Sequence, residues 1–309
     1  MNYIIKIIVP LVFLIGLVGY LSTKTPAIKD VATAPSPLAK MYCRARGVLA
    51  NTPGTATGPS YCIESNSTLG TVTPLVPFAY SFSIVDNNGN ILKDFTLERE
   101  KLLHLIVVRK DLQEFQHLHP VFAPATGMFT LSGLTLSTAG EYRIFADFTP
   151  KNAPLDAEGS PLPTNTFEDA VALGAYTPKH LGQETTSDTV EDYSISLATA
   201  PQQLTKGANM FTFTVTRNGK PVTNLEDYLG ALGHAVILKE GTLDYIHTHA
   251  IKSASSSQNG TIKFHVEFPS AGKYKVFMQF QHQGKVRTSS FVVSVTDATG
   301  AAIQHEMQH

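Results

Sequence analysis

Two short motifs carry histidines at a spacing suited to metal binding. "QHLHP" and "IHTHA" each contain a His-x-His pair inside a stretch that is typical of β-strands. Because side chains alternate along a strand, both histidines of a pair project from one face, with Cα atoms about 6.5–7 Å apart. A third histidine precedes each pair by 13 residues. The two sets are His104, His117 and His119, and His234, His247 and His249.

The residues between the third histidine and the pair predict a β-hairpin. "HLIVVRKDLQEF" has the pattern of a strand, a turn at residues 110–113 and a returning strand. A hairpin centred near residues 111–112 places His104 opposite His119, with Cβ atoms about 5 Å apart. A slightly earlier centre places it opposite His117. Both registers gather three imidazoles on one face, and the same construction applies to the second set.

Three histidines on one face suit a divalent metal ion. Neutral imidazoles about 2 Å from the ion, with a fourth position open, are typical of Zn(II) or Cu(II) sites. A blue-copper electron-transfer centre needs a cysteine thiolate, and neither cysteine lies near the motifs. Hydrolytic zinc chemistry needs a positioned carboxylate, whereas Glu114 and Asp244 fall at the turn ends of the hairpins. No nucleophile, acid–base pair or cofactor loop stands out, so we expect metal binding and no enzymatic activity.

Other histidines and methionines are weaker candidates. His282 in "QFQHQG" is a seventh candidate metal ligand, and Met278 precedes it. The His/Met tail, residues 298–309, ends in "HEMQH". His180 and His265 stand in no such pattern, and we interpret them as incidental.

The histidines also allow an interpretation without a metal. The predicted histidine face carries Ile106, Val108 and Phe115 as well, so it could point into a protein core, where a histidine simply hydrogen-bonds its neighbours. The alternative function is then a structural or protein-interaction module with packing histidines, for which an exposed apolar patch is expected.

The two histidine sets belong to an internal repeat. "HLIVVRKDLQEFQHLHP" and "HAVILKEGTLDYIHTHA" start 130 residues apart, and their only identities are the three histidines. Asn-Gly pairs at 88–89 and 218–219 have the same offset of 130. Further along the chain, "AGEYRIFADF" is similar to "AGKYKVFMQF" at an offset of 132. A duplication explains these matches economically.

Each repeat predicts an all-β domain. Charged residues make up only 16% of the chain, which has 22 glycines and 18 prolines, and each unit consists of short strand patterns without an amphipathic helix. We expect two tandem Ig-like or cupredoxin-like β-sandwich domains, residues 71–186 and 187–297. Tyr142 in "GEY" and Tyr274 in "GKY" are expected to bond nearby backbone at a corner. The net charge of −1 and the lack of a basic stripe exclude a nucleic-acid partner.

The N-terminus predicts a membrane anchor. Lys6 is the one charge between residues 3 and 21, a length of about 19 residues that can cross a bilayer as a helix. We expect residues 1–21 to be an uncleaved signal anchor or transmembrane helix, with a cleaved signal peptide as the alternative. Residues 22–40 are a Pro/Ala/Thr-rich tether. The body of the chain is then extracytoplasmic, at the cell membrane as a single-pass protein in the periplasm or extracellular space.

Two cysteines lie in a loop that precedes the first repeat. Residues 41–70 contain Cys43 and Cys62 around a Gly/Pro/Thr-rich segment. In an oxidising compartment this even count predicts a disulfide, with a thiolate metal pair as the alternative.

The repeats resemble a family of bacterial secreted or membrane-anchored tandem Ig-like proteins with duplicated H…HxH motifs. The resemblance rests on "HLIVVRKDLQEFQHLHP", "LGALGH", "HTHA" and "YKVFMQFQH" and covers roughly residues 75–296. It implies copper or heavy-metal handling by the six histidines and His282, although "ADFTP" gives the first repeat no counterpart of His282. The expected function is that of a membrane-tethered metal chaperone, buffer or sensor, copper before zinc, partnered by a metal transporter or another envelope protein.

Overall fold

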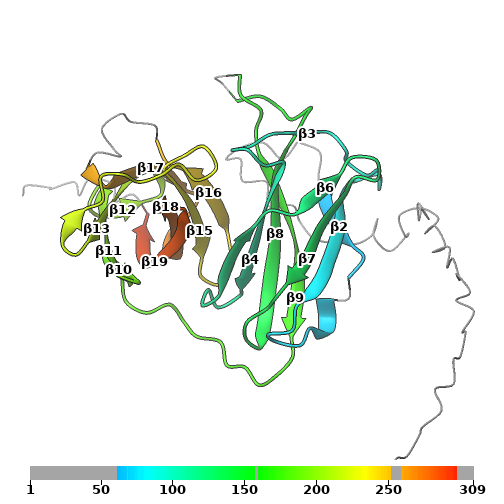
Figure 1. Cartoon of the computed structure of the whole chain (residues 1–309), viewed down its shortest axis with the longest axis horizontal. Coiled ribbons are helices and arrows are strands. Elements are labelled where there is room, and N and C mark those ends of the chain that lie inside the picture. The colour runs from blue at the N-terminus through cyan, green and yellow to red at the C-terminus, as the bar shows by residue number, and fades with distance from the viewer. Residues whose placement is uncertain (1–60, 68, 157–158, 252–258, 298–309) are drawn as a thin grey trace, which may run out of the picture. The chain divides into compact units, whose positions relative to one another are not determined.

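The structure, a computed structural model, describes residues 61–67, 69–156, 159–251 and 259–297. In these segments every regular element is a β-strand except one 3-10 turn, η1 (Leu69–Thr71). The expected all-β class is therefore confirmed for the part of the chain that the structure describes (Figure 1).

The first half of the chain forms two sheets over one core. One sheet has the order β1-β2-β7-β6, and the other has the order β3-β8-β4-β5 with β9 beside β8. The strands are β1 (Tyr61–Ser65), β2 (Phe78–Asp86), β3 (Phe95–Thr96), β4 (Leu103–Arg109), β5 (Phe115–Leu118), β6 (Val121–Ala123), β7 (Met128–Leu134), β8 (Gly140–Pro150) and β9 (Thr164–Ala172). Alternation along β2 turns Tyr80, Phe82 and Ile84 into the core.

The second half repeats this arrangement. Its sheets have the orders β10-β11-β13-β14, with β17 beside β13, and β12-β19-β18-β15-β16. The strands are β10 (Ser187–Val190), β11 (Tyr193–Ala200), β12 (Leu204–Thr205), β13 (Gly207–Arg217), β14 (Lys220–Pro221), β15 (Gly233–Lys239), β16 (Tyr245–His249), β17 (Thr261–Phe268), β18 (Gly272–His282) and β19 (Lys285–Thr296). Alternating residues of β13 and β17 pack on β15, β18 and β19 in a second core.

Several local predictions are confirmed. Asn218 and Gly219 both have positive φ, 52° and 74°, in the turn between β13 and β14, as an Asn-Gly hairpin turn requires. The Tyr142 hydroxyl donates to the Thr138 carbonyl oxygen at 2.9 Å, and the Tyr274 hydroxyl donates to the Ser270 carbonyl oxygen at 2.8 Å. The two halves are thus sandwich-like and share local details as well as strand order.

The hairpin sheets are buried on both faces. All seven residues of β4 and six of seven in β15 are buried, which explains why both read as continuous apolar runs instead of alternating ones. One face of β4 packs into its own core, and the other contributes Ile106 and Val108 to a third apolar cluster that includes Val236 and Leu238 of the second half. The histidine face of the hairpin therefore points at the other half of the chain, and not into its own sandwich.

Aromatic pairs join the two halves in this third cluster, called the interhalf cluster below. Phe145 of β8 stacks on Tyr245 of β16 with ring centroids 4.8 Å apart, and Phe115 stacks on Phe277 at 4.3 Å. Such contacts add about 0.5–1.5 kcal/mol each beyond the burial of apolar area.

Several predictions fall outside the described residues. The anchor (1–21), the tether (22–40), residues 41–60 of the cysteine loop and the tail (298–309) are among them. In the part that is described, no helix has the length and apolar character needed to cross a membrane. Cys62 lies in β1, and β1 pairs with β2 of the first half. β1 precedes residue 71, where the first β-sandwich domain was expected to begin. Cys43 lies outside the described residues, so the disulfide stays a prediction.

Replacing Phe145 by Ala should weaken the interhalf cluster selectively. We expect a loss of about 3 kcal/mol in the free energy of unfolding and a split of the denaturant transition into two, because the halves lose one of the aromatic stacks that join them. Phe148→Ala is the matched control: it lies on the same strand, is equally buried and belongs to the core of the first half. A single transition in Phe145→Ala, at the wild-type midpoint, would show that the cluster does not couple the halves.

Candidate metal centre

The six motif histidines form one cluster between the two halves. The His104 ring centroid lies 5.1 Å from those of His117, His119 and His247. In the second set, His234 and His249 are 4.8 Å apart. The sequence predicted two sites, one in each hairpin. The structure instead joins the two sets, because the histidine faces of both hairpins meet next to the interhalf cluster.

The structure selects one of the two hairpin registers that the sequence left open. His234 pairs directly with His249 across β15 and β16. In the first hairpin, Leu105 pairs with Leu118, which places His104 opposite His119 one step further on. The centre near residues 111–112 is thus the correct one.

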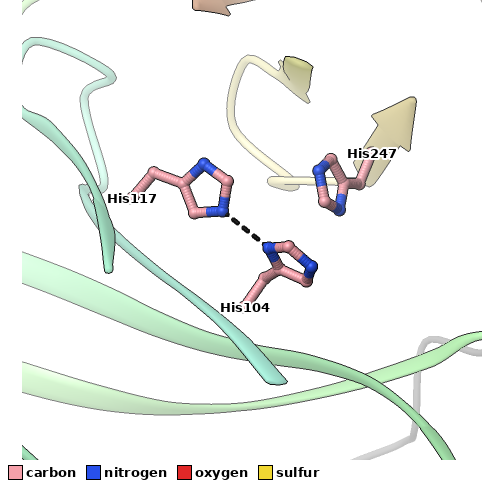
Figure 2. A group of neighbouring side chains, drawn as sticks. All are labelled: His104, His117 and His247. Carbon is pink, nitrogen blue, oxygen red and sulfur yellow. Dashed lines mark hydrogen bonds between the residues drawn. The ribbon is translucent and has the colours of Figure 1, made fainter. Parts of the chain in front are cut away.

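His104 and His117 face each other with two lone pairs. His104 Nδ1 lies 2.9 Å from His117 Nε2 (Figure 2). The other nitrogen of each ring points at an oxygen: His104 Nε2 donates to the Glu98 carbonyl at 3.1 Å, and His117 Nδ1 donates to Gln279 Oε1 at 2.6 Å. In neutral rings these bonds leave a lone pair, and no hydrogen, on both facing atoms. A metal ion placed against both atoms would turn this repulsion into two coordinate bonds.

His119 does not change this conclusion. Its Nε2 lies 3.2 Å from the same His104 Nδ1 and can donate to it, since a neutral imidazole carries one N–H. In that arrangement, too, no hydrogen atom lies between His117 Nε2 and His104 Nδ1.

His247 completes a three-histidine group with ligands from both halves. Each of His104, His117 and His247 offers a ring nitrogen within 4.8 Å of the others, and Figure 2 shows the His247 ring reaching the other two from the opposite hairpin. His247 Nδ1 donates to Asp147 Oδ2 at 2.8 Å, while its Nε2 is buried without a hydrogen-bond partner. A carboxylate that fixes the tautomer of a histidine in this way is typical of metal ligands.

A second group, His234, His247 and His249, shares His247 with the first. Both ring nitrogens of His234 and Nε2 of His249 are buried without a hydrogen-bond partner. Buried polar atoms are nearly always paired in proteins, so this concentration of unpaired nitrogens is compatible with a ligand that binds among them.

Burial keeps the cluster uncharged. Desolvation, followed by repulsion from neighbouring imidazoles, lowers the pKa of His119 and of His249 to about 2. The pKa values of the other four are lowered for the same leading reason. Burial raises the pKa of Asp147 to about 6, so at neutral pH this group is mainly a carboxylate. The cluster thus presents neutral imidazoles, the protonation state in which histidine binds a metal.

The sequence did not identify the two residues whose side chains hydrogen-bond cluster histidines, Asp147 and Gln279. Asp147 pairs with His104 across β8 and β4, and Gln279 pairs with His234 across β18 and β15. Each reaches across to a histidine of the opposite hairpin. The signal was present as a polar residue at the same place in "IFADF" and "VFMQF", two apolar strands at the offset of 132.

Glu98 and Tyr228 flank the cluster at equivalent positions of the repeat. Each starts a tight turn with left-handed residues, Arg99 and Glu100 in one and Leu229 and Gly230 in the other. The Glu98 carboxylate lies 3.9 Å from His249 Nδ1. The Tyr228 ring contacts His117, His119 and His234. The two sides of the cluster are therefore chemically different.

The structure does not bring His282 to the other six histidines. Its Nδ1 bonds the Tyr193 hydroxyl at 2.7 Å and its Nε2 bonds Asn224 Oδ1 at 3.1 Å, so both nitrogens are occupied as in a packing histidine. Met278 is fully buried in the core of the second half. In the block "YKVFMQFQH" the residue that contacts the cluster is therefore Gln279, and not His282.

Comparison with known proteins identifies a family. The model described as "Domain of unknown function (DUF8832)" matches residues 65–158 and 188–297, so the chain belongs to this family. No curated protein matches the chain. The expected likeness to tandem Ig-like metal-handling proteins stays a prediction.

Solved structures give only distant likenesses. The soluble domain of PmoD from Methylocystis sp. ATCC 49242 (Rockwell) is 15% identical over 36% of this chain and 96% of that one, with a TM-score of 0.26. Invasin, a bacterial integrin-binding protein, is 13% identical over 77% and 39%, with a TM-score of 0.23. Domains 5–6 of the S-layer protein SbsC are 15% identical over 78% and 100%, with a TM-score of 0.21. Likenesses this weak carry no conclusion about the chain.

Acid should destabilise the metal-free protein. The folded histidines have lowered pKa values, so the unfolded chain binds more protons once the pH falls below about 6.5. Asp147 acts in the opposite direction between pH 6 and 4, since its folded pKa is raised, but it is one group against six. We expect the free energy of unfolding to fall from pH 7 to pH 5. His119→Ala should reduce that dependence by about one proton. A profile that is flat over this range would contradict the burial of neutral histidines.

Proposed function

We propose that this member of the DUF8832 family binds a divalent transition-metal ion, copper before zinc, in the six-histidine cluster. The observation that carries the proposal is the pair of facing lone pairs on His104 Nδ1 and His117 Nε2, 2.9 Å apart, with the other nitrogen of each ring held by an oxygen. An ion between these atoms turns the repulsion into two coordinate bonds.

The unpaired nitrogens argue against packing histidines. A histidine that serves only the packing of a core has its nitrogens satisfied, as His282 does. His234 has neither nitrogen satisfied, and His247 and His249 each leave Nε2 without a partner. A metal-free interaction module, the alternative function, gives no reason for this difference.

The donor set favours copper over zinc and a single tightly held ion. All candidate donors are imidazole nitrogens, for which Cu(II) generally has the higher affinity among the two. Neighbouring ligands about 2.0 Å from an ion stand about 2.8 Å apart in a tetragonal copper site and about 3.3 Å apart in a tetrahedral zinc site. The separations of 2.9 and 3.2 Å around His104 lie within this range. Because the two three-histidine groups share His247, both cannot be filled in full at once. The proposal is therefore one tight ion per chain, not one in each hairpin.

The ion is proposed to be carried rather than used in catalysis. Of the two carboxylates beside the cluster, Asp147 bonds His247 Nδ1 and Glu98 Oε1 lies 3.9 Å from His249 Nδ1, so both lie next to histidines that would hold the ion. In this proposal the protein is a chaperone, buffer or sensor and not an enzyme. In the same proposal, the two halves are sandwiches of the Ig-like or cupredoxin-like class. Residues 1–21 anchor the protein in the membrane, and the bulk of the chain lies outside the cytoplasm. A metal transporter or another envelope protein is the partner that such a carrier needs.

Substituting His247 by Ala should abolish tight binding. This histidine belongs to both three-histidine groups, so we expect Cu(II) titration of the full-length protein to give about one tight equivalent in the wild type and none in His247→Ala. His282→Ala and His180→Ala are the matched controls and should each retain the equivalent. Retention of one tight equivalent in His247→Ala would refute the assignment of the site.

Asp147 should tune the affinity without being a ligand. Asp147→Asn keeps the shape but removes the charge that supports His247, and loss of such a supporting carboxylate costs about 10–100-fold in metal affinity. Asp169→Asn, in the Arg143 ion pair on β9, is the control and should leave the affinity unchanged. Competition with a chelator of known affinity measures both. Equal affinities in the two variants would remove Asp147 from the site.

A further inference from the structure

A cavity between the two halves borders the cluster. Its volume is about 530 Å³, and it is lined by residues of β8, β9, β16, β17 and the start of β13. Asp147, Tyr245 and His247 form part of its wall. Since His247 Nδ1 bonds Asp147 in this wall while Nε2 is left for the cluster, this one histidine contacts both spaces.

The cavity contains a polar group with an unmet hydrogen bond. Asn165 is 4% exposed, and its Oδ1 has no hydrogen-bond partner. It stands directly opposite Asp147 in the β8–β9 pair, so the two side chains are neighbours on one face of the sheet. A buried carbonyl oxygen of this kind needs a donor, and a water molecule in the cavity, either free or bound to a cation, can supply it.

Charged and metal-binding groups also line the cavity. His265 and Glu267, two residues apart on β17 and both exposed, belong to its lining. Alternation along the strand turns them to the same side. Lys206 is the one cationic side chain among the lining residues. His265, which the sequence gave no role, therefore lies at the opening of a space that leads to His247.

We propose that this cavity is the passage through which a hydrated divalent cation enters and leaves the six-histidine cluster, with His265 and Glu267 as its first contacts. The proposal rests on the proposed function. Its reason is access: the side chains of His247 and Asp147 are only 6% and 11% exposed, so an ion cannot reach them from bulk solvent without a route.

The size and charge of the cavity fit this role. Six water molecules occupy about 180 Å³ in the liquid, so a hexahydrated ion fits within 530 Å³. An acidic group at the mouth of a cleft raises the local cation concentration and the association rate, and a basic group lowers both. Glu267 and Lys206 therefore act in opposite directions on the same step.

The test is the rate of Cu(II) binding in the full-length protein. Tyrosine fluorescence is a suitable signal, since the chain has no tryptophan and Tyr228 and Tyr245 contact cluster histidines. In stopped flow we expect the double variant His265→Ala/Glu267→Gln to lower the association rate constant about tenfold. Lys206→Glu should raise it, a gain that a folding defect cannot imitate. The matched control is His180→Ala/Glu184→Gln, which removes the same residue types outside the cavity.

The outcomes separate the two proposals. One tight equivalent of Cu(II), with a slower double variant, a faster Lys206→Glu and an unchanged control, supports the passage. One tight equivalent with the same rate constant in all four proteins overturns the passage and leaves the cluster intact. Absence of tight Cu(II) binding in the wild type overturns the cluster and the passage together.

Discussion

The packing of two hairpin sheets against each other is the interaction on which the rest of the structure depends. β4 and β15 bury both of their faces, so each half of the chain has one sheet that cannot face water. The Phe145–Tyr245 and Phe115–Phe277 stacks join these sheets. The six histidines lie on the same strand faces as the apolar residues of the interhalf cluster. The contact that buries this cluster therefore also removes water from the six imidazoles. Desolvated neutral imidazoles gain more from a metal ion than hydrated ones do.

The duplication produced a cluster that is symmetric in its histidines and asymmetric in their support. Asp147 supports His247 with a carboxylate, whereas Gln279 supports His117 with a neutral amide. Glu98 approaches one side of the cluster and the Tyr228 ring the other. Positive charge is better tolerated on the side of the carboxylates, so the proposed ion would bind nearer to His247. The cluster is asymmetric because the two repeats diverged around their three histidines.

The sequence could predict what depends on local order, and it could not predict what depends on packing between repeats. The hairpins, two possible registers for them and the repeat follow from strand alternation, turn residues and the offset of 130; the choice between the registers came from the structure. The meeting of His117 with Gln279, 162 positions away, does not, because periodicity shows which face is apolar but not what covers it. The prediction of His282 as a metal ligand was wrong for a related reason. Its sequence block resembles the other histidine blocks, and only the structure shows that its two ring nitrogens bond Tyr193 and Asn224. Asp147 and Gln279 were missed because they are not histidines, although each interrupts an apolar strand at the same place.

The most direct measurement is a copper-edge anomalous diffraction map of crystals of the protein loaded with one equivalent of Cu(II). The account predicts one strong peak about 2 Å from ring nitrogens of His247 and of at least one of His104 and His117, so that both halves contribute ligands to one ion. A peak inside one hairpin set alone, or peaks only at histidines outside the cluster, would contradict it.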